Sequence, residues 1–526
     1  MTTFAGATIP AWAHAADVPD FLALREGDRP LVIVAPHGGR RLRPIRRGDS
    51  VNDLHTAGIA WELAERTGAR AIVNHGLDRN QSDLNRISHL STRSRSVLEL
   101  LLAAIDAASA GGHVPLVLFV HGWNMVVPCC DIGIGLKRRA GRLTGRYPTL
   151  SRECFEGTIA AVDRELHARG VSAAIGRRYT ASGRDNAAQL FSGRHAGHED
   201  ARVRSLARLS LDGRVDAAQL ELGIPLRWEG TLRAGLLDGL CAALNATCQA
   251  KVAAGSARSW TQQAVVGKED HLELEAGYGL QAVLDAEGTT SLFCGVEAGS
   301  PTSMAARFCI VATDGSMMLL VGEAEWSGER GRYALEGFSW TAEDDGRRIT
   351  IRLRAPMIRY PTHEAYLDLE EGLAASTLVD ADVSLCFDAT TADYGMLTGR
   401  VQAGSIDVEV STVAFVDRSG RRAGTQDRIH ISVARGEGDV RILRSGDGGG
   451  PALEWLRDET PLGHIRDATA ASGLRRASVI ARVPVWRPLG GGGFARWTFG
   501  MVRCRFDDDA PEVPGLFASL EVFRRT

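Results

Sequence analysis

The hydrophobic pattern of this chain changes its period near residue 256, and that change limits the folds that it can adopt. Before this point, short apolar runs alternate with amphipathic stretches at helical spacing. After it, apolar and polar residues alternate at period two, and turn residues separate the runs at roughly regular intervals. A chain of 526 residues also exceeds what one hydrophobic core supports, so we predict two domains, at residues 1–255 and 256–526.

The first half predicts an α/β domain with a mostly parallel sheet and helices on both faces, because strands and helices alternate along the chain. The predicted strands lie within residues 30–39, 69–76, 114–124, 171–179 and 216–228. The predicted helices lie within residues 53–68, 94–112, 158–170 and 231–255. The first of these helices is expected to stop at Gly68.

The second half predicts an all-β structure, an antiparallel barrel or sandwich that could form two lobes, without inserted helices of note. Its period-two runs include RYALEGFSW, RRITIRLRAP, GSIDVEVSTVAFV and ARWTFGMVRCRF, which begin at residues 332, 347, 404 and 495. Two glycine-rich segments, 445–451 and 490–493, do not lead into a helix, so they predict turns rather than phosphate-binding loops.

The composition argues against several classes of protein. The formal net charge of −3 gives no overall attraction to nucleic acid or anionic membranes, and no apolar run approaches the ~18 residues of a membrane span. Nine cysteines without metal-like CxxC spacing, and an N-terminus without a secretory signal, favour a cytoplasmic protein. A local basic cluster is either a solvated loop or a surface that steers an anionic substrate: Arg40, Arg41, Arg43, Arg46 and Arg47.

Two histidines, His37 and His121, follow apolar runs and precede glycines. Open α/β sheets place their active sites at the carboxyl ends of parallel strands, which is where both imidazoles are expected. Two imidazoles and one carboxylate are a common zinc ligand set that leaves a position for water. Asp53 is the candidate third ligand, with His55 and Glu62 as rivals, although an aspartate at position 53 could instead cap the following helix.

Arg79, Asn85 and Arg86 form a second group of polar candidates. A guanidinium binds a substrate carboxylate through two parallel hydrogen bonds, and a nearby amide can complete the clamp. The alternative is that these arginines form surface ion pairs with Asp78 and Asp83.

Glu221 lies in an otherwise apolar strand between Leu220 and Leu222, so its side chain must point away from both leucines. A carboxylate in such a strand has to be paired, hydrated or functional, because burial of an unpaired charge is costly. Beside a zinc ion, Glu221 could act as the general base for a water molecule.

The motifs PHGG (36–39), NDLH (52–55), LDRNQSDLNR (77–86), HG (121–122) and QLELGIPLR (219–227) occur in this order. Through them, about residues 25–250 resemble the N-formylglutamate amidohydrolase family, a relative of the zinc carboxypeptidases. The resemblance implies a phosphorylase/hydrolase-like α/β fold, a zinc ion, and release of formate from an N-formyl amino acid.

The resemblance also implies a role for each candidate residue: zinc ligation by His37, Asp53 and His121, binding of the substrate carboxylate by Asn85 and Arg86, support of the developing oxyanion by Arg79, and general-base catalysis by Glu221. The chain departs from the family at two positions. The family usually has an acidic residue where this chain has Phe119, and a serine where it has Gly122. The first departure removes a carboxylate of the kind that orients a zinc-bound imidazole.

In the second half, residues 393–422 and 494–506 resemble the two-lobed lipocalin-like domains of carotenoid hydratase and Diels–Alderase relatives, in their strand pattern and a DRSG turn at 417–420. Several tryptophans could line a cavity for an apolar ligand or fill the core: Trp326, Trp340, Trp455, Trp486 and Trp497. No catalytic residue is predicted in this half.

The leading expectation is a zinc-dependent amidohydrolase that acts on a small molecule. Metal-activated water would cleave an N-formyl or N-acyl amide next to a carboxylate, with Glu221 as the general base. The alternative is a non-catalytic binding protein, with a degenerate hydrolase domain and a β-barrel that binds an apolar small molecule. A zinc carboxypeptidase proper is disfavoured because Arg40, rather than an acidic residue, lies three positions after His37.

Overall fold

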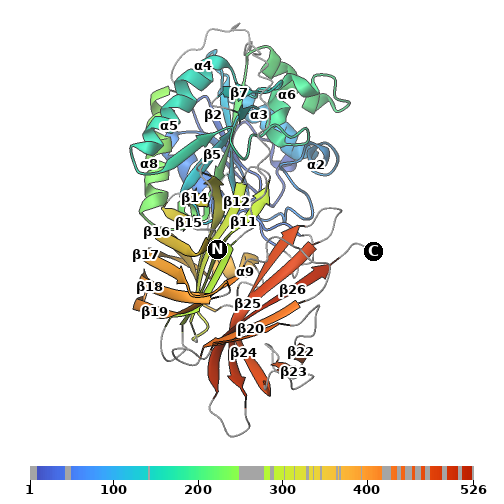
Figure 1. The fold of residues 1–526 in the computed structure, drawn as a ribbon. Helices are drawn as coiled ribbons and strands as arrows, with labels where there is room; N and C mark the ends of the chain where they lie inside the picture. The colour runs from blue at the N-terminus through green and yellow to red at the C-terminus, as the bar shows by residue number, and fades with distance from the viewer. Residues whose placement is uncertain are drawn as a thin grey trace. The chain divides into compact units, whose positions relative to one another are not determined.

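The computed structural model contains two compact units, residues 1–269 and 270–526, and each is described by itself (Figure 1). The predicted boundary at residue 255 lies outside the described residues, as do the two glycine-rich segments and three arginines of the basic cluster, Arg43, Arg46 and Arg47. The structure describes residues 9–41, 49–139, 142–247, 278–284, 290–300, 303–312, 314–326, 331–335, 337–343, 346–362, 365, 369–392, 394–417, 428–434, 440–444, 453–456, 464–467, 474–488, 494–506 and 512–523.

The first unit is built on one large sheet. Its strands are β1 (Leu22–Arg25), β2 (Leu31–Ala35), β3 (Arg70–Asn74), β4 (Leu116–Gly122), β5 (Cys129–Gly133), β8 (Ser172–Ile175) and β9 (Asp216–Leu222), and a separate hairpin is formed by β6 (Lys137–Arg139) and β7 (Arg142–Thr144). The strand order is β1-β3-β2-β4-β9-β5-β8. Strands β3, β2, β4 and β9 are parallel, whereas β1 and the β5–β8 pair run antiparallel to them. The predicted mostly parallel sheet is confirmed.

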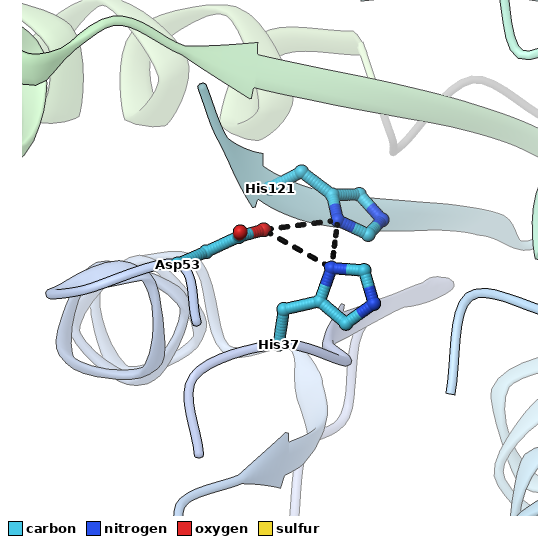
Figure 2. A group of neighbouring side chains, drawn as sticks. All are labelled: His37, Asp53 and His121. Atoms are coloured by element: carbon cyan, nitrogen blue, oxygen red, sulfur yellow. Dashed lines mark hydrogen bonds and ion pairs between the residues drawn. The ribbon is translucent and has the colours of Figure 1, made fainter. Parts of the chain in front are cut away.

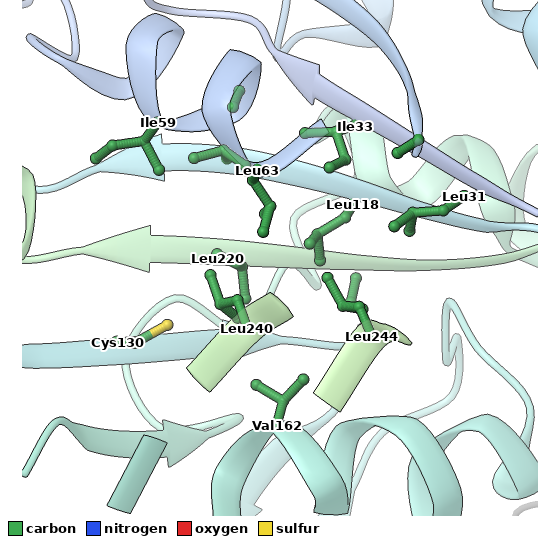
Figure 3. Close-up of a cluster of buried hydrophobic side chains, with 14 of the residues drawn as sticks. Leu31, Ile33, Ile59, Leu63, Leu118, Cys130, Val162, Leu220, Leu240 and Leu244 are labelled. Carbon is green, nitrogen blue, oxygen red and sulfur yellow. The ribbon is translucent and has the colours of Figure 1, made fainter. Parts of the chain in front are cut away.

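Helices cover both faces of this sheet, as the sequence predicts. They are η1 (Ala15–Asp17), α1 (Thr56–Thr67), α2 (Ile87–Thr92), α3 (Arg95–Ala108), α4 (Arg152–Cys154), η2 (Phe155–Ile159), α5 (Ala160–His167), η3 (Ala187–Phe191), η4 (Gly193–His195), α6 (Ala201–Leu211), α7 (Ile224–Arg227) and α8 (Thr231–Thr247). Within β2, Leu31 and Ile33 pack in the cluster of α1, α5 and α8, which Figure 3 shows. Val32 and Val34 pack in the opposite cluster, with α2, α3 and α6. In the described part of the chain, no helix is long and apolar enough to cross a membrane.

Helix α1 ends at the predicted glycine. Gly68 has a left-handed backbone with φ of 68°, and its N–H donates a hydrogen bond to the carbonyl oxygen of Ala64. Residues with a Cβ atom disfavour this conformation, so glycine fixes where the helix stops.

Strand β5 was not predicted from the sequence. Its residues, CCDIG, show no clear alternation of apolar and polar side chains, so the period-two signal is absent. In the structure β5 lies between β9 and β8 and pairs Asp131 with Glu221 of β9. Asp131 is buried, and its Oδ2 accepts hydrogen bonds from the backbone N–H groups of Arg178 and Tyr179, both at 2.7 Å. A second carboxylate therefore lies next to the candidate general base.

The second unit is all-β, with antiparallel pairing between its described strands, which confirms the predicted class. A closed barrel is formed by β10 (Tyr278–Val283), β11 (Thr290–Ser300), β12 (Ser303–Ala312), β13 (Met317–Trp326), β14 (Arg332–Leu335), β15 (Phe338–Glu343), β16 (Arg348–Tyr360), β17 (Thr377–Ala389), β18 (Tyr394–Ala403) and β19 (Ile406–Asp417). The short helix α9 (Leu369–Ala374) precedes β17. A second sheet, in the order β21-β20-β26-β25-β24-β23-β22, is formed by β20 (Arg428–Ala434), β21 (Val440–Arg444), β22 (Leu453–Leu456), β23 (His464–Asp467), β24 (Arg476–Pro488), β25 (Phe494–Arg505) and β26 (Val513–Phe523).

Trp340 is the tryptophan of this unit whose surroundings the structure describes. It lies in β15, paired with Tyr333 of β14 and Ile351 of β16, and all three side chains are buried. Trp340 thus belongs to the buried apolar set of the barrel. The side chains of Trp326, Trp455, Trp486 and Trp497 lie outside the described residues.

Residues 1–269 should fold without the rest of the chain, because both core clusters that pack against the sheet draw on this unit alone. We expect a 1–269 fragment to be soluble and to unfold in urea in one cooperative transition, followed by circular dichroism and tryptophan fluorescence. The full-length chain is the control. An insoluble fragment beside a stable full-length protein would mean that the first unit needs the second for its stability.

Candidate metal centre

The two candidate histidines lie at the carboxyl ends of neighbouring parallel strands. His37 follows β2 directly after Pro36, and His121 is the penultimate residue of β4. Alternation along β4 puts His121 on the same face as Phe119, opposite Val120. Asp53 comes just before α1, and its N–H donates to the carbonyl oxygen of His37 at 2.8 Å. Strand ends and one helix-preceding loop therefore bring the three residues together.

Three ligand atoms converge at one point. Nδ1 of His37, Nδ1 of His121 and Oδ2 of Asp53 lie 3.2 Å from one another in each pair. Figure 2 shows both imidazole rings and the carboxylate directed toward this common point. Atoms bound to a tetrahedral zinc ion at about 2.0–2.1 Å lie about 3.3 Å apart, so the observed triangle has the size of one face of such a site. All three residues are buried, and together they could hold a metal ion.

Two members of this triangle, His121 and Asp53, carry the protonation that a bound cation requires. Burial lowers the pKa of His121 to about 4, so its imidazole is neutral at neutral pH. Burial alone would raise the pKa of Asp53, but the charge of His37 and hydrogen bonds with both imidazoles lower it well below its ordinary value. A neutral imidazole and an ionised carboxylate are the forms that bind metals. Burial alone would lower the pKa of His37, but the charge of Asp53 and hydrogen bonds with Asp53 and Asp83 raise it, so a cation bound here would displace a proton from His37.

Asp83 orients the first candidate ligand, His37. His37 Nε2 lies 2.6 Å from Oδ1 of Asp83, and a proton on Nε2 leaves the Nδ1 lone pair free for a metal. Burial alone would raise the pKa of Asp83, but its hydrogen bond with His37 and the charge of His37 keep it below its ordinary value. The sequence predicts Asp83 only as an ion-pair partner, although its place inside the LDRNQSDLNR motif was a usable signal.

Arg79 links the two aspartates that contact His37. Its Nη1 donates to Oδ1 of Asp53 at 3.1 Å and to the carbonyl oxygen of Val51 at 3.1 Å, and its Nη2 lies 3.8 Å from Oδ2 of Asp83. Its Nε is buried without a hydrogen-bond partner among the described residues. The guanidinium therefore neutralises the carboxylates around the triangle.

The second imidazole lacks a partner on its outer side. His121 Nε2 is buried and has no hydrogen-bond partner in the described part of the chain. Two residues earlier, where the family that the sequence resembles usually has an acid, the Phe119 ring packs against Phe191 with centroids 6.1 Å apart. The departure noted in the sequence thus leaves His121 oriented by packing and by its Nδ1 contacts alone.

The rival third ligands lie elsewhere. The His55 ring packs edge-on against Trp228 with centroids 4.6 Å apart, and His55 itself occupies the N-cap position of α1. Glu62 lies on α1 and forms an ion pair with Arg233 at 3.2 Å. The carboxylate of Asp53 therefore serves the triangle rather than the helix N-terminus.

Glu221 lies beside this triangle on the neighbouring strand. In the register of β4 and β9 it pairs with His121, so the two side chains share a face of the sheet, while Leu220 and Leu222 enter the opposite core. Gln219 Nε2 donates to Oε1 of Glu221 at 2.7 Å, and Asn186 Nδ2 donates to Oε1 of Gln219 at 2.9 Å. Burial and then the charge of Asp53 raise the pKa of Glu221 well above its ordinary value. A hydrogen-bonded chain that the sequence did not reveal thus fixes this carboxyl group.

Arg86 is the exposed member of the second polar group. Its side chain is 59% exposed, with Nε 3.3 Å from Oδ2 of Asp83 and Nη1 4.0 Å from Asp185. The backbone N–H of Asn85 donates to Oδ1 of Asp83 at 2.9 Å, and Oδ1 of Asn85 accepts from the N–H of Ala187 at 3.3 Å. The ion pair with Asp83 is therefore present, and a solvent-facing guanidinium remains close to the triangle of candidate ligands.

Comparisons with known proteins add little. No protein-family description matches this sequence, and no curated protein matches it either. Among solved structures, the chain is similar to a crystal structure of CghA with Sch210972. That match has 12% sequence identity and a TM-score of 0.26, and it covers 47% of this chain and 89% of the other. A likeness this distant carries no argument about function.

Proposed function

We propose that this chain is a zinc-dependent amidohydrolase that cleaves an N-formyl or N-acyl amide next to a carboxylate. The observation that carries the proposal is the buried triangle of His37, Asp53 and His121, with the Glu221 carboxyl group on the adjoining strand. Metal ligands beside a buried carboxylate are the arrangement used for metal-assisted hydrolysis. When bound, a zinc ion supplies a positive charge that polarises a carbonyl group and makes a water molecule more acidic.

Glu221 would move the proton in this reaction. Its ionised Oε accepts a proton from water while the water oxygen attacks the amide carbon, and the carboxyl group then gives that proton to the departing nitrogen as the C–N bond breaks. A raised pKa suits both steps, because the carboxylate is then a stronger base and its acid form persists long enough to donate. The hydrogen bond from Gln219 holds Oε1 in place for the transfer.

Arg86 and Asn85 would bind the substrate carboxylate, and Arg79 would support the charge that develops on the amide oxygen. Arg86 suits this role because its guanidinium is exposed and its contact with Asp83 Oδ2, at 3.3 Å, uses only Nε. Its Nη1 lies 4.0 Å from Oδ2 of Asp185, beyond hydrogen-bond distance, so the two terminal NH₂ groups could form parallel hydrogen bonds with a carboxylate. For Arg79, the supporting observation is the buried Nε without a partner among the described residues.

The proposal is tested directly by metal reconstitution. Full-length protein is stripped with a chelator, supplied with zinc, and assayed for free amine released from N-formyl and N-acyl amino acids. We expect hydrolysis by the zinc-loaded protein and none by the stripped protein. A zinc-loaded protein that hydrolyses no member of the panel would contradict the proposed activity, whatever its affinity for the metal.

Replacing Arg86 with alanine should lower kcat/KM by about 10–100-fold for substrates that carry a carboxylate, the scale of a lost hydrogen-bonded charge contact. The neutral amide of the same substrate should be almost unaffected. Arg93→Ala is the matched control, because Arg93 is an exposed arginine whose Nη1 donates to the carbonyl oxygen of Gln81. Equal losses on both substrates would assign Arg86 a structural role.

A second candidate function is a non-catalytic protein with a degenerate hydrolase unit. The observation that favours it is the unpartnered Nε2 of His121 beside Phe119, since outer partners normally strengthen metal binding. The reconstitution experiment separates the two candidates, because a degenerate unit would hydrolyse nothing even with zinc bound.

A further inference from the structure

Arg227, at the end of α7, is a cation enclosed in the first unit. Its side chain is completely buried, and among the described residues no carboxylate oxygen lies within 4.0 Å of its guanidinium. Moving a charged group out of water without an ion-pair partner costs free energy, so other contacts of the guanidinium have to offset that cost. Burial lowers the pKa of Arg227 to about 10, which leaves it charged at neutral pH.

The guanidinium of Arg227 is hydrogen-bonded to two of the three segments that carry the candidate metal ligands, those of Asp53 and His121. Nη1 donates to the carbonyl oxygen of Leu54 at 2.9 Å, and Leu54 follows the ligand Asp53. Nη2 donates to the carbonyl oxygen of Trp123 at 2.9 Å and to Oδ1 of Asn124 at 3.0 Å, just after the ligand His121. Helix α7 itself directly follows β9, the strand of Glu221. One side chain therefore connects three segments of the candidate site.

Gly122 makes room for this side chain. A Cβ atom on Gly122 would lie 2.7 Å from both Cζ and Nη1 of Arg227, closer than two such atoms can approach. The N–H of Gly122 also donates to Oδ2 of Asp53 at 3.0 Å, the oxygen that faces both imidazoles. The guanidinium thus occupies the space that a side chain would take at the residue after His121.

We propose that Arg227 is a positioning residue that holds Asp53 and His121 at the separation a metal ion requires. The proposal rests on the metal site of the proposed function, and it does not depend on which amide is cleaved. The planar guanidinium donates to two backbone carbonyls from two nitrogens in fixed directions, whereas an ammonium group donates from one freely rotating nitrogen. Without it, the segments of Leu54 and Trp123 lose their common partner, and the carbonyl oxygens of both residues lose a hydrogen bond.

The test compares Arg227→Met and Arg227→Lys with the wild type in the full-length chain. The matched control is Arg233→Met, which removes a largely buried arginine of α8 that pairs with Glu62 and Glu229 instead. Three quantities are measured for each variant. The first is the zinc dissociation constant, from competition with a chelating dye; the second is the visible spectrum with Co²⁺ in place of zinc; the third is the Tm of the metal-free protein. For Arg227→Met we expect about 10–100-fold weaker zinc binding, the usual effect of losing a partner that orients metal ligands, and an altered Co²⁺ spectrum. Arg227→Lys should lie between this variant and the wild type.

Gly122→Ala tests the contact between Gly122 and the Arg227 guanidinium by changing the glycine instead of the arginine. It replaces Arg227→Met as the test if that variant fails to fold. The added methyl group should displace the guanidinium and weaken zinc binding in the wild-type background. With methionine at position 227 the same alanine should cost less, because the thinner side chain can yield, so the two effects should not add.

Three results would overturn the proposal. The proposal is wrong, and the proposed function is untouched, if the Arg227 variants have the same zinc affinity and Co²⁺ spectrum as Arg233→Met. An unchanged affinity and spectrum in Gly122→Ala would lead to the same conclusion. A wild-type chain that binds neither metal would overturn the proposed function and this inference together, whereas a chain that binds zinc but hydrolyses no amide would overturn only the function.

Discussion

Replacing Glu221 with glutamine should remove about 10²–10⁴-fold of the hydrolytic rate while zinc binding and folding survive. Glutamine has nearly the same shape as glutamate, but its amide cannot accept a proton from water at neutral pH. Its side-chain oxygen can still accept the hydrogen bond that Gln219 donates to Oε1 at 2.7 Å. In the folded protein the Glu221 carboxyl group carries a raised pKa because it is buried, so a neutral amide at this position should not lower the Tm.

The measurement is kcat on an N-formyl amino acid, together with zinc content and Tm for each variant. Asp131→Asn is the informative companion, since Asp131 is the buried carboxylate that pairs with Glu221 across β5 and β9. The side-chain oxygen of asparagine can still accept the two backbone hydrogen bonds that Oδ2 of Asp131 accepts, so this variant should fold and keep most of its hydrolytic activity. Wild-type activity in Glu221→Gln would exclude this glutamate as the base and leave the proposed mechanism without its central residue.

Removing both imidazoles, in the double variant His37→Ala, His121→Ala, should abolish stoichiometric zinc binding. We expect the wild type to bind about one zinc ion per chain, because the triangle supplies three ligands and leaves one position open. Asp53 alone cannot hold the ion in the double variant. The measurement is zinc per chain by atomic absorption after dialysis against limiting zinc, with His195→Ala as the control, since the ring of His195 contacts the Arg184 carbonyl oxygen instead.

The wild type and the double variant should also differ in how zinc changes their free energy of unfolding. A ligand that binds only the folded state at 100 times its dissociation constant stabilises that state by about 2.7 kcal/mol. Zinc should therefore raise the Tm of the stripped wild type and leave the Tm of the double variant unchanged. Full zinc occupancy in the double variant would mean that the ion binds at another site, and the triangle of His37, Asp53 and His121 would lose its assignment.

Periodicity explains how much of this site the sequence could predict. Apolar runs indicate strands, and a histidine directly after such a run lies at the end of the strand. This reasoning placed His37 and His121 at strand ends, where the structure has them. The period of two along β9 fixed the direction of Glu221, opposite the leucines on either side. The third ligand remained open among neighbouring residues, because the turn before α1 has no periodic signal. The backbone of that turn, with His55 at φ of 69°, directs Asp53 inward and His55 toward Trp228.

The sequence by itself determined the two structural classes, the strands that carry the candidate residues, and the faces on which His121 and Glu221 lie, because these follow from local spacing and burial. It did not determine where β9 ends: the strand predicted over 216–228 stops at Leu222, and α7 (Ile224–Arg227) follows. Only the tertiary structure decided which charged groups support them. Asp83 reaches His37 across 46 residues, and Arg227 reaches the Leu54 carbonyl oxygen across 173. Strand β5 places Asp131 beside Glu221, although its sequence lacks the alternation of apolar and polar residues that would predict a strand. Such contacts depend on how separate loops pack over the sheet. Whether a charged side chain is buried there therefore follows from the tertiary structure and not from local spacing in the sequence.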